Sequence, residues 1–366
     1  MQTKKRIAIL FGGRSAEHEV SLQSARNLIA AIDRDKYEAV LIGIDRQGAW
    51  FLNDESMPLL QADNPRLIAL NQGSKAVSLV SGDQAGVLVD LHNPGGSTSV
   101  DVIFPVLHGP YGEDGSVQGL AKLANVACVG SDILGSAIGM DKDVCKRLLR
   151  DAGIEVARHL CIRRNSLSQD LPAEVAQLLG YPVFVKPANM GSSVGVVKVD
   201  KAAALMAALD YALQYDSKVL IEEAIVGREI ECAVLGNNDP RASIVGEIET
   251  DDGFYSYEKK YIDEDAAKLK IPANLDEETM ARVQQVSIAA FKALEARGMA
   301  RVDMFLTAAG EIYVNEINTI PGFTSISMYP KLWQASGLSY TELIDRLIQL
   351  AIEEQQEKAA LKTTGY

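Results

Sequence analysis

The sequence predicts an α/β protein with two or three domains, and three observations support this class. Residues 6–11 (RIAILF) form an apolar run that ends in two glycines and precedes a helical pattern, as a buried parallel strand does. Residues 181–225 alternate strand and helix patterns in a compact β-loop-β-α-β unit. Residues 277–317 contain a long helix pattern followed by two strand patterns. A chain of 366 residues is long enough to bury more than one core.

The first region continues with alternating strand and helix patterns. Apolar residues recur on one face over residues 21–32, which predicts a helix. Strands are predicted at 39–44 and 101–107, and both are largely apolar. Residues 53–98 are rich in Asn, Asp, Gly and Ser, and we interpret them as a variable excursion of weak signal.

The later regions have clearer boundaries. The pattern at 141–152 predicts a helix that begins a new domain, with Gly153 as its C-terminal cap. A third region begins with strand character at 228–235. The short turn that ends at Gly310 predicts an antiparallel pair of the strands around it. A last helix is predicted at 340–354.

Composition excludes some functions. The net charge of −13 argues against binding to nucleic acid or to an anionic membrane, since both require clustered Lys and Arg. The four cysteines are widely spaced with no CxxC pair, so we expect reduced thiols and neither zinc nor a redox motif. The N-terminal apolar run is too short for a signal peptide, and no apolar stretch is long enough to span a membrane. We therefore expect a cytoplasmic protein.

The last hairpin has the strongest chemical pattern. Arg301 and Asp303 are two residues apart on one strand, and Glu316 and Asn318 are two apart on the next, so all four are expected on one face. Oxygen ligands of this kind suit Mg²⁺ beside a nucleotide, because magnesium prefers carboxylates, phosphate and water. The alternative is a strand with polar residues toward solvent, but Val302 and the motif NEINTIPGF are not typical of a solvent face.

Two further segments fit phosphate and nucleotide. Lys186 ends a strand and precedes a Gly/Ser loop, whose backbone N–H groups could close over phosphates, although the Walker pattern is absent and such loops are often plain turns. Glu222, Glu223 and Glu229 could accept hydrogen bonds from adenine or ribose, and a solvated strand end is the alternative.

Three segments have weaker patterns. The Gly-Gly turn before Glu17 lacks the G-x-G-x-x-G pattern, and acids there suit either a helix dipole or a ligand ammonium group. His108 lies where strand ends bind ligands in open α/β sheets, but a lone histidine is more often structural. The aromatic and cationic stretch 254–261 fits a lid that excludes water, or an ordinary exposed loop.

These segments occur together in one order, and in this order the chain resembles the D-alanine–D-alanine ligases of bacterial cell-wall synthesis. The matching segments are AEHEVSLQSA at 16–25, HGPYGEDGSVQG at 108–119, MDKDVCKRLL at 140–149, VKPANMGSSVG at 185–195, and ARVDMFL to NEINTIPGFTSISMYP at 300–330. The resemblance implies a three-domain ATP-grasp fold with ATP between the last two domains, and a homodimer. The domains would be a Rossmann-like parallel α/β unit at 1–140, a central α+β unit at 141–226, and a C-terminal ATP-grasp unit at 227–366.

The resemblance also assigns roles to residues by position. The residues that would contact ATP, including the phosphate-contacting lysines, are Lys142, Lys186, Ser193, Glu222, Glu223, Ile225, Glu229, Lys260, Phe305 and Asn315. Asp303, Glu316 and Asn318 would hold two Mg²⁺ or Mn²⁺ ions. Those that would bind D-alanine or act in catalysis are Glu17, His108, Ser192, Tyr261, Arg301, Gly322, Ser327 and Met328, with Glu17, Ser192 and Tyr261 forming a hydrogen-bonded triad.

The implied reaction is the ATP-dependent joining of two D-alanine molecules through an acyl phosphate, with release of ADP and phosphate. Relatives that make D-alanyl-D-lactate are the nearest alternative, and the presence of Tyr261 favours the dipeptide product. The alternative from another class is a nucleotide-binding protein that does not turn over a substrate. The intact set of polar residues around Arg301 and Asp303 argues against this alternative.

Overall fold

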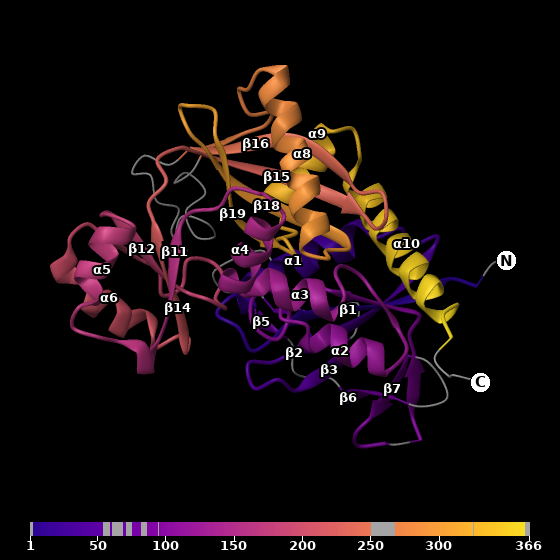
Figure 1. Ribbon diagram of the computed structural model, residues 1–366. Coiled ribbons are helices and arrows are strands. Elements are labelled where there is room, and N and C mark those ends of the chain that lie inside the picture. The colour runs from indigo at the N-terminus through magenta and orange to yellow at the C-terminus, as the bar shows by residue number, and fades with distance from the viewer. Residues whose placement is uncertain are drawn as a thin grey trace.

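Within the residues that it describes, the computed structural model has three large β-sheets with helices packed against them, and one separate pair of short strands (Figure 1). The structure describes residues 3–53, 59–60, 69–70, 75–81, 86–93, 95–249, 268–324 and 326–362.

The N-terminal sheet has eight strands, and its parallel half matches the predicted elements. The order is β10-β9-β1-β2-β3-β6-β7-β8, and the first four strands run parallel. They are β1 (Lys5–Gly12), β2 (Tyr37–Ile44), β9 (Val102–Pro105) and β10 (Ala127–Cys128). Helices α1 (His18–Ala31) and α2 (Ser116–Leu123) connect them, and α1 begins three residues before the predicted helix.

The other half of this sheet comes from the stretch of weak signal. Strands β3 (Trp50–Asn53), β6 (Lys75–Val80), β7 (Val87–Asp90) and β8 (Ser97–Ser99) extend the sheet in antiparallel pairs. Two short strands, β4 (Leu59–Leu60) and β5 (Ala69–Leu70), pair with each other. The domain is therefore a mixed sheet, and parts of the predicted variable excursion, 53–98, form strands of it. Strands β3, β6, β7 and β8 are short and only partly buried, which leaves a weak periodic signal.

Helices α3 (Ile133–Met140) and α4 (Lys142–Asp151) lead out of the first sheet. Asp141 caps α4, because its side chain accepts from the backbone N–H of Val144 at 3.0 Å. Gly153 follows the helix at φ 74°, as predicted for its cap. The buried face of α4, which includes Leu149, packs in one core with α8 and the C-terminal sheet. This helix therefore packs outside the core of the central sheet.

The central unit is a four-stranded antiparallel sheet in the order β11-β14-β12-β13. Its strands are β11 (His159–Arg163), β12 (Val183–Pro187), β13 (Val197–Val199) and β14 (Lys218–Glu223). Helices α5 (Leu171–Leu178) and α6 (Leu205–Ala212) share its core, and this unit forms a separate lobe on the left in Figure 1. Both α5 and β11 lay outside the predicted elements.

The C-terminal sheet has five antiparallel strands in the order β17-β16-β15-β18-β19. They are β15 (Arg228–Gly236), β16 (Arg241–Glu249), β17 (Lys268–Lys270), β18 (Gly298–Leu306) and β19 (Ile312–Asn318). Helix α8 (Glu277–Ala293) packs on one face, and it ends three residues before the predicted bound. The predicted antiparallel pairing around Gly310 is confirmed.

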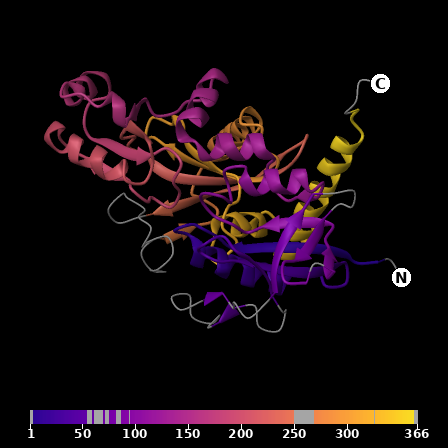
Figure 2. The same ribbon diagram turned by 90° about the horizontal axis from the view of Figure 1, so that it is seen from below.

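Helices α9 (Met328–Ala335) and α10 (Tyr340–Ala359) join the first and last units. One continuous core contains Phe104 of the N-terminal sheet, Phe323, Tyr329 of α9 and Leu347 of α10. The rings of Phe104 and Phe323 meet edge to face at 5.9 Å. Figure 2 shows the N-terminal sheet below these helices, with the central lobe away to one side. Among the described helices, none has the length and apolar character needed to cross a membrane.

Candidate active site

A cavity of about 720 Å³ lies between the central sheet and the C-terminal sheet. Each described residue that was predicted to contact ATP lines it. These are Lys142, Lys186, Ser193, Glu222, Glu223, Ile225, Glu229, Phe305 and Asn315. Lys260 lies outside the described residues. The cavity is also lined by Asp303, Glu316 and Ser192, so residues from five strands and two loops meet in one place.

The β18–β19 hairpin places its polar residues as predicted. Asp303 lies opposite Glu316, and Arg301 lies opposite Asn318. The guanidinium of Arg301 donates two hydrogen bonds of 2.7 Å to the carboxylate of Asp303, and Asn318 Nδ2 donates to the same carboxylate at 2.9 Å. Directly opposed residues of an antiparallel pair point to the same face, which brings these four side chains together.

The donor set of this hairpin fits a magnesium or manganese ion. Asp303 and Glu316 line the cavity with carboxylates, and Asn318, whose Nδ2 donates to Asp303, would add an amide oxygen. Within the described part of the chain, no group of three or more His, Cys, Asp or Glu side chains is arranged to hold a metal. A site here therefore depends on two carboxylates, the amide and oxygens from the ligand.

Two lysines flank the Glu222 carboxylate at the back of the cavity. Lys186 Nζ lies 2.6 Å from Glu222 Oε2 and donates to Asn315 Oδ1 at 3.2 Å. Lys146 Nζ lies 3.4 Å from Glu222 Oε1. Burial alone would raise the pKa of Glu222, but the two lysines outweigh it and lower that pKa to about 2. Glu222 is therefore an ionised acceptor in the cavity wall.

Lys142 links the Glu316 carboxylate to the Gly/Ser loop. Its Nζ donates to the backbone oxygen of Met190 at 2.8 Å and lies 3.3 Å from Glu316 Oε2. Burial opposes the charged form, yet Glu316 raises the pKa of Lys142 overall. Lys142 is therefore a cation at the point where loop and hairpin meet.

The Gly/Ser loop has an unusual backbone. Ser192 and Ser193 both have positive φ, at 51° and 59°, a region that residues with a Cβ rarely adopt. The Ser192 hydroxyl donates to the carboxylate of Glu17. A Cβ at Gly191 would lie 2.8 Å from Glu17 Oε2, so a larger residue there would displace the Glu17 carboxylate. The third member of the predicted triad, Tyr261, lies outside the described residues.

The opposite end of the cavity is formed by the segment after β14. The Glu223 carboxylate accepts from the backbone N–H and from Nε of Arg158, both at 2.7 Å, which leaves its backbone toward the cavity. Glu229 lies opposite Phe305 in the β15–β18 pair. This combination of an apolar ring and a carboxylate is suited to a base and a ribose.

His108 is held by the protein on both sides of its ring. Its Nδ1 lies 3.1 Å from the backbone oxygen of Ile320, and its Nε2 lies 3.1 Å from Ser24 Oγ. Ser24 Oγ in turn accepts from the backbone N–H of Phe323 at 3.2 Å. Burial lowers the pKa of His108, which favours the neutral ring. These contacts support the structural role of His108: it anchors the loop of Gly322 to the N-terminal domain.

The residues predicted to bind the second amino acid lie in this loop. Ser327 Oγ accepts from the backbone N–H of Thr324 at 3.0 Å, and a Cβ at Gly322 would lie only 2.7 Å from Ser327 Oγ. The side chain of Met328 is 4% exposed and belongs to the shared core. Met328 is not among the described residues that line the cavity.

Two residues of the site were missed in the sequence. Glu231 lines the cavity, and its Oε2 lies 2.9 Å from Arg301 Nε. The sequence contained a pattern that could have indicated Glu231, because Glu229 and Glu231 are two residues apart on one strand and so share a face. Lys146 had no such signal, since its partner Glu222 lies far along the chain.

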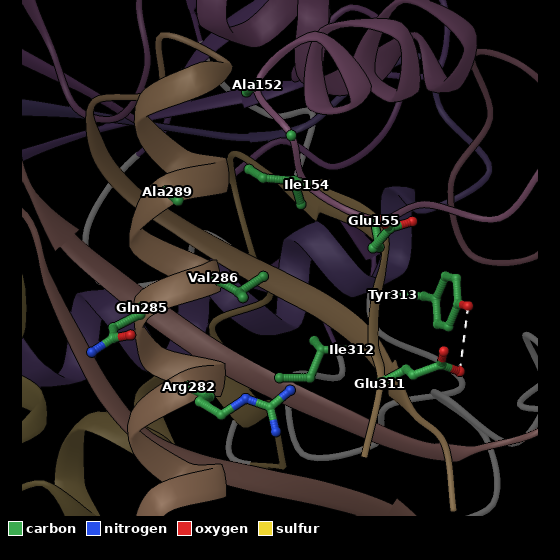
Figure 3. Close-up of a pocket in the computed structure, with 11 residues that line it drawn as sticks. Ala152, Ile154, Glu155, Arg282, Gln285, Val286, Ala289, Glu311, Ile312 and Tyr313 are labelled. Carbon is green, nitrogen blue, oxygen red and sulfur yellow. Dashed lines mark hydrogen bonds between the residues drawn. The ribbon is translucent and has the colours of Figure 1, made fainter. Parts of the chain in front are cut away.

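A second cavity, of about 700 Å³, lies on the other side of the C-terminal sheet (Figure 3). Arg282 and Gln285 of α8 border it on one side, and Glu155, Glu311 and Tyr313 border it on the other. None of the residues predicted for nucleotide or substrate binding is among the described residues that line it.

Two α+β units that enclose a cavity lined by lysines and carboxylates define the ATP-grasp class of ATP-dependent ligases. The family models agree with this class. The model for the N-terminal part of D-alanine–D-alanine ligases matches residues 6–131, and the model for the C-terminal part matches residues 148–349. The chain belongs to the D-alanine–D-alanine ligase family.

Individual relatives are similar over nearly the whole chain. D-alanine–D-alanine ligase of Shouchella clausii is 55% identical over 99% of both chains, and D-alanine–D-alanine ligase A of Escherichia coli is 53% identical over 99% of both. The D-alanine–D-alanine ligase structure from Coxiella burnetii has a TM-score of 0.84 and 37% identity, covering 97% of this chain and 96% of that one. The structure of VanG D-Ala:D-Ser ligase from Enterococcus faecalis has a TM-score of 0.83 and 38% identity, covering 95% of this chain and all of that one. The protein is therefore an ATP-dependent ligase.

Proposed function

We propose that the protein joins two molecules of D-alanine through a D-alanyl phosphate, with release of ADP and phosphate. The observation that carries this proposal is the meeting of Lys142, Lys186, Asp303 and Glu316 around one cavity. The names of the relatives support D-alanine as the substrate. Such a dipeptide serves peptidoglycan synthesis.

The nucleotide would lie with its base toward Glu222, Ile225 and Phe305 and its ribose toward Glu229. Its phosphates would lie beneath the Gly/Ser loop, within reach of Lys142 and Lys186. Phosphoryl transfer depends mainly on positioning and on offsetting charge, and these two ammonium groups supply both.

Asp303, Glu316 and Asn318 would hold two Mg²⁺ or Mn²⁺ ions. When bound, such ions offset charge on the phosphate oxygens. Arg301 and Asn318 donate hydrogen bonds to the carboxylate of Asp303. We infer that these contacts hold the carboxylate in a fixed orientation.

The amino-acid substrates would lie on the N-terminal side. Glu17 would accept from the ammonium of the first D-alanine, oriented by its hydrogen bond from Ser192. The free amine of the second D-alanine then attacks the activated carbonyl, and its carboxylate would be bound by Ser327. Arg301 and the backbone N–H of Gly322 would stabilise the oxyanion of that step.

The test is phosphate release from ATP with D-alanine, L-alanine, D-serine and D-lactate supplied in turn as second substrate. We expect release with D-alanine and a dipeptide product by mass spectrometry. Phosphate release that does not depend on D-alanine would contradict the proposal. D-Serine is included because the VanG relative is named for it, and D-lactate because it tests the depsipeptide alternative.

Two further features are part of this proposal. We expect a homodimer, as in the family, and light scattering measures it directly. We also place the reaction in the cytoplasm, where ATP is available, and cell fractionation tests that location.

A further inference from the structure

Lys146 is a buried charged residue that the proposed reaction does not use. It lies on α4 and is 1% exposed. Its Nζ donates to the backbone oxygen of Asn315 at 3.0 Å and lies 3.4 Å from Glu222 Oε1. It is not among the described residues that line the cavity, whereas Glu222 and Asn315 are. Lys146 therefore lies behind the cavity wall and contacts it from the protein side.

Lys186 is the other cation that contacts Glu222, and it has a second proposed role. Lys186 lies 2.6 Å from Glu222 Oε2, and the proposed function requires its ammonium at a phosphate. A lysine that turns toward a phosphate weakens its pairing with Glu222. Because Glu222 is only 2% exposed, water cannot replace the lost partner, and an unpaired buried carboxylate is costly.

We propose that Lys146 is a positioning residue: it holds the Glu222 carboxylate in the cavity wall when Lys186 engages a phosphate, and thereby sets a preference for adenine over guanine nucleotides. This inference rests on the proposed function. Adenine presents an amino donor where guanine presents a carbonyl acceptor. An ionised Glu222 accepts from the amino group and repels the carbonyl, whereas a protonated Glu222 could donate to the carbonyl.

The geometry explains why Lys146 is suited to this task. Its position on α4 is fixed by the core that contains Leu149 and Cys145, so it cannot follow Lys186 toward a ligand. Its second contact, to the Asn315 backbone, lies in the middle of β19 and is equally fixed. The ammonium therefore keeps its distance from Glu222 whether or not a nucleotide is bound.

The experiment measures kcat and KM for ATP and for GTP at saturating D-alanine in Lys146→Met and Lys146→Gln. We expect KM for ATP to rise roughly 10- to 100-fold, the effect of losing a hydrogen bond to a charged group, while kcat changes by less than about threefold. The ratio of kcat/KM for ATP over GTP falls by a similar factor. Lys146→Gln retains a donor for Asn315 without the charge, so it separates the charge from packing.

Leu149→Ala is the matched control, because it removes a wholly buried side chain one turn away on the same helix. It lowers Tm without changing nucleotide preference. A folded Lys146→Gln variant with wild-type KM and wild-type preference would overturn the inference. If both Lys146 variants fail to fold, we combine each with Glu222→Gln. A double variant that folds supports the pairing of Lys146 with Glu222, and a double variant that is still unfolded contradicts it. A wild-type protein that shows no D-alanine-dependent phosphate release would instead reject the proposed function.

Discussion

The hydroxyl of Ser192 donates a hydrogen bond to the carboxylate of Glu17, although the two residues are 175 positions apart. Glu17 lies just before α1 in the N-terminal domain, and Ser192 lies in the loop between β12 and β13 of the central lobe. This contact joins the two units at the Gly/Ser loop.

Ser192→Ala removes this contact and leaves the Glu17 carboxylate without its hydroxyl donor. We expect kcat/KM for the first D-alanine to fall by roughly 10- to 100-fold, because a hydrogen bond to a charged group is lost. Steady-state kinetics with D-alanine as the varied substrate measure the effect. Ser97→Ala, at the exposed edge of the N-terminal sheet, is the control and should leave kcat/KM unchanged.

Arg301→Ala removes the proposed oxyanion donor and the partner of two carboxylates, Asp303 and Glu231. We expect kcat to fall by roughly 10²- to 10³-fold, the scale for loss of one such donor. Arg301→Lys should recover little, because an ammonium cannot form the two parallel hydrogen bonds to Asp303. An unchanged kcat in Arg301→Ala would reject the role. Arg346→Ala, which removes an exposed ion pair with Glu353, is the control.

Asp303→Asn tests the metal site. We expect the Mg²⁺ concentration for half-maximal activity to rise about tenfold or more, since a carboxylate ligand is replaced by a neutral amide. Titration of activity with Mg²⁺ at fixed ATP measures it, and a chelator should abolish wild-type activity. A variant that needs no more Mg²⁺ than the wild type would show that Asp303 is not a ligand.

Gly322→Ala places a methyl group 2.7 Å from the hydroxyl oxygen of Ser327. Because this contact is closer than van der Waals distance, either the Ser327 hydroxyl or the loop must shift. The hydroxyl is held by its hydrogen bonds with Thr324, so we expect the loop to move together with its backbone N–H. We expect kcat to fall by roughly tenfold or more while Tm changes by only a few degrees. Adding Ser327→Gly removes the clash and should restore Tm, although not substrate binding. Equal Tm in the single and double variants would contradict the predicted clash.

Glu113 predicts a pH dependence of stability. Burial and the nearby Glu17 raise the pKa of Glu113 from 4.5 to about 8. Between these values the folded state binds more protons than the unfolded state, so the free energy of unfolding falls as pH rises from about 4.5 to about 8. The slope from one such group is at most about 1.4 kcal/mol per pH unit.

Chemical denaturation of the wild type and of Glu113→Gln across this pH range measures that slope. The glutamine cannot titrate, so the difference in unfolding free energy between the two proteins should change in favour of the variant as pH rises. Parallel curves for the two proteins would show that Glu113 keeps its ordinary pKa in the folded state.

The sequence by itself determined the regular elements that carry the site. Period-2 apolar patterns and a short turn at Gly310 were enough to predict the β18–β19 pair, and with it the common face of Arg301, Asp303, Glu316 and Asn318. The cap at Gly153 was equally local, because a left-handed residue after a helix favours glycine. Motifs in a fixed order indicated the family, and the family models confirm it.

The tertiary structure decided what these local patterns do not contain. Strands β3, β6, β7 and β8 are short and partly exposed, and they are stabilised by pairing in the sheet more than by their own composition. The role of His108 depends on Ser24 and Ile320, which are distant in the chain. Lys146 appears in the sequence as one charge on a helix, and only its burial beside Glu222 makes it part of the site. Periodicity shows which face of an element is buried, whereas the partner of a buried charge is set by packing between elements far apart in sequence.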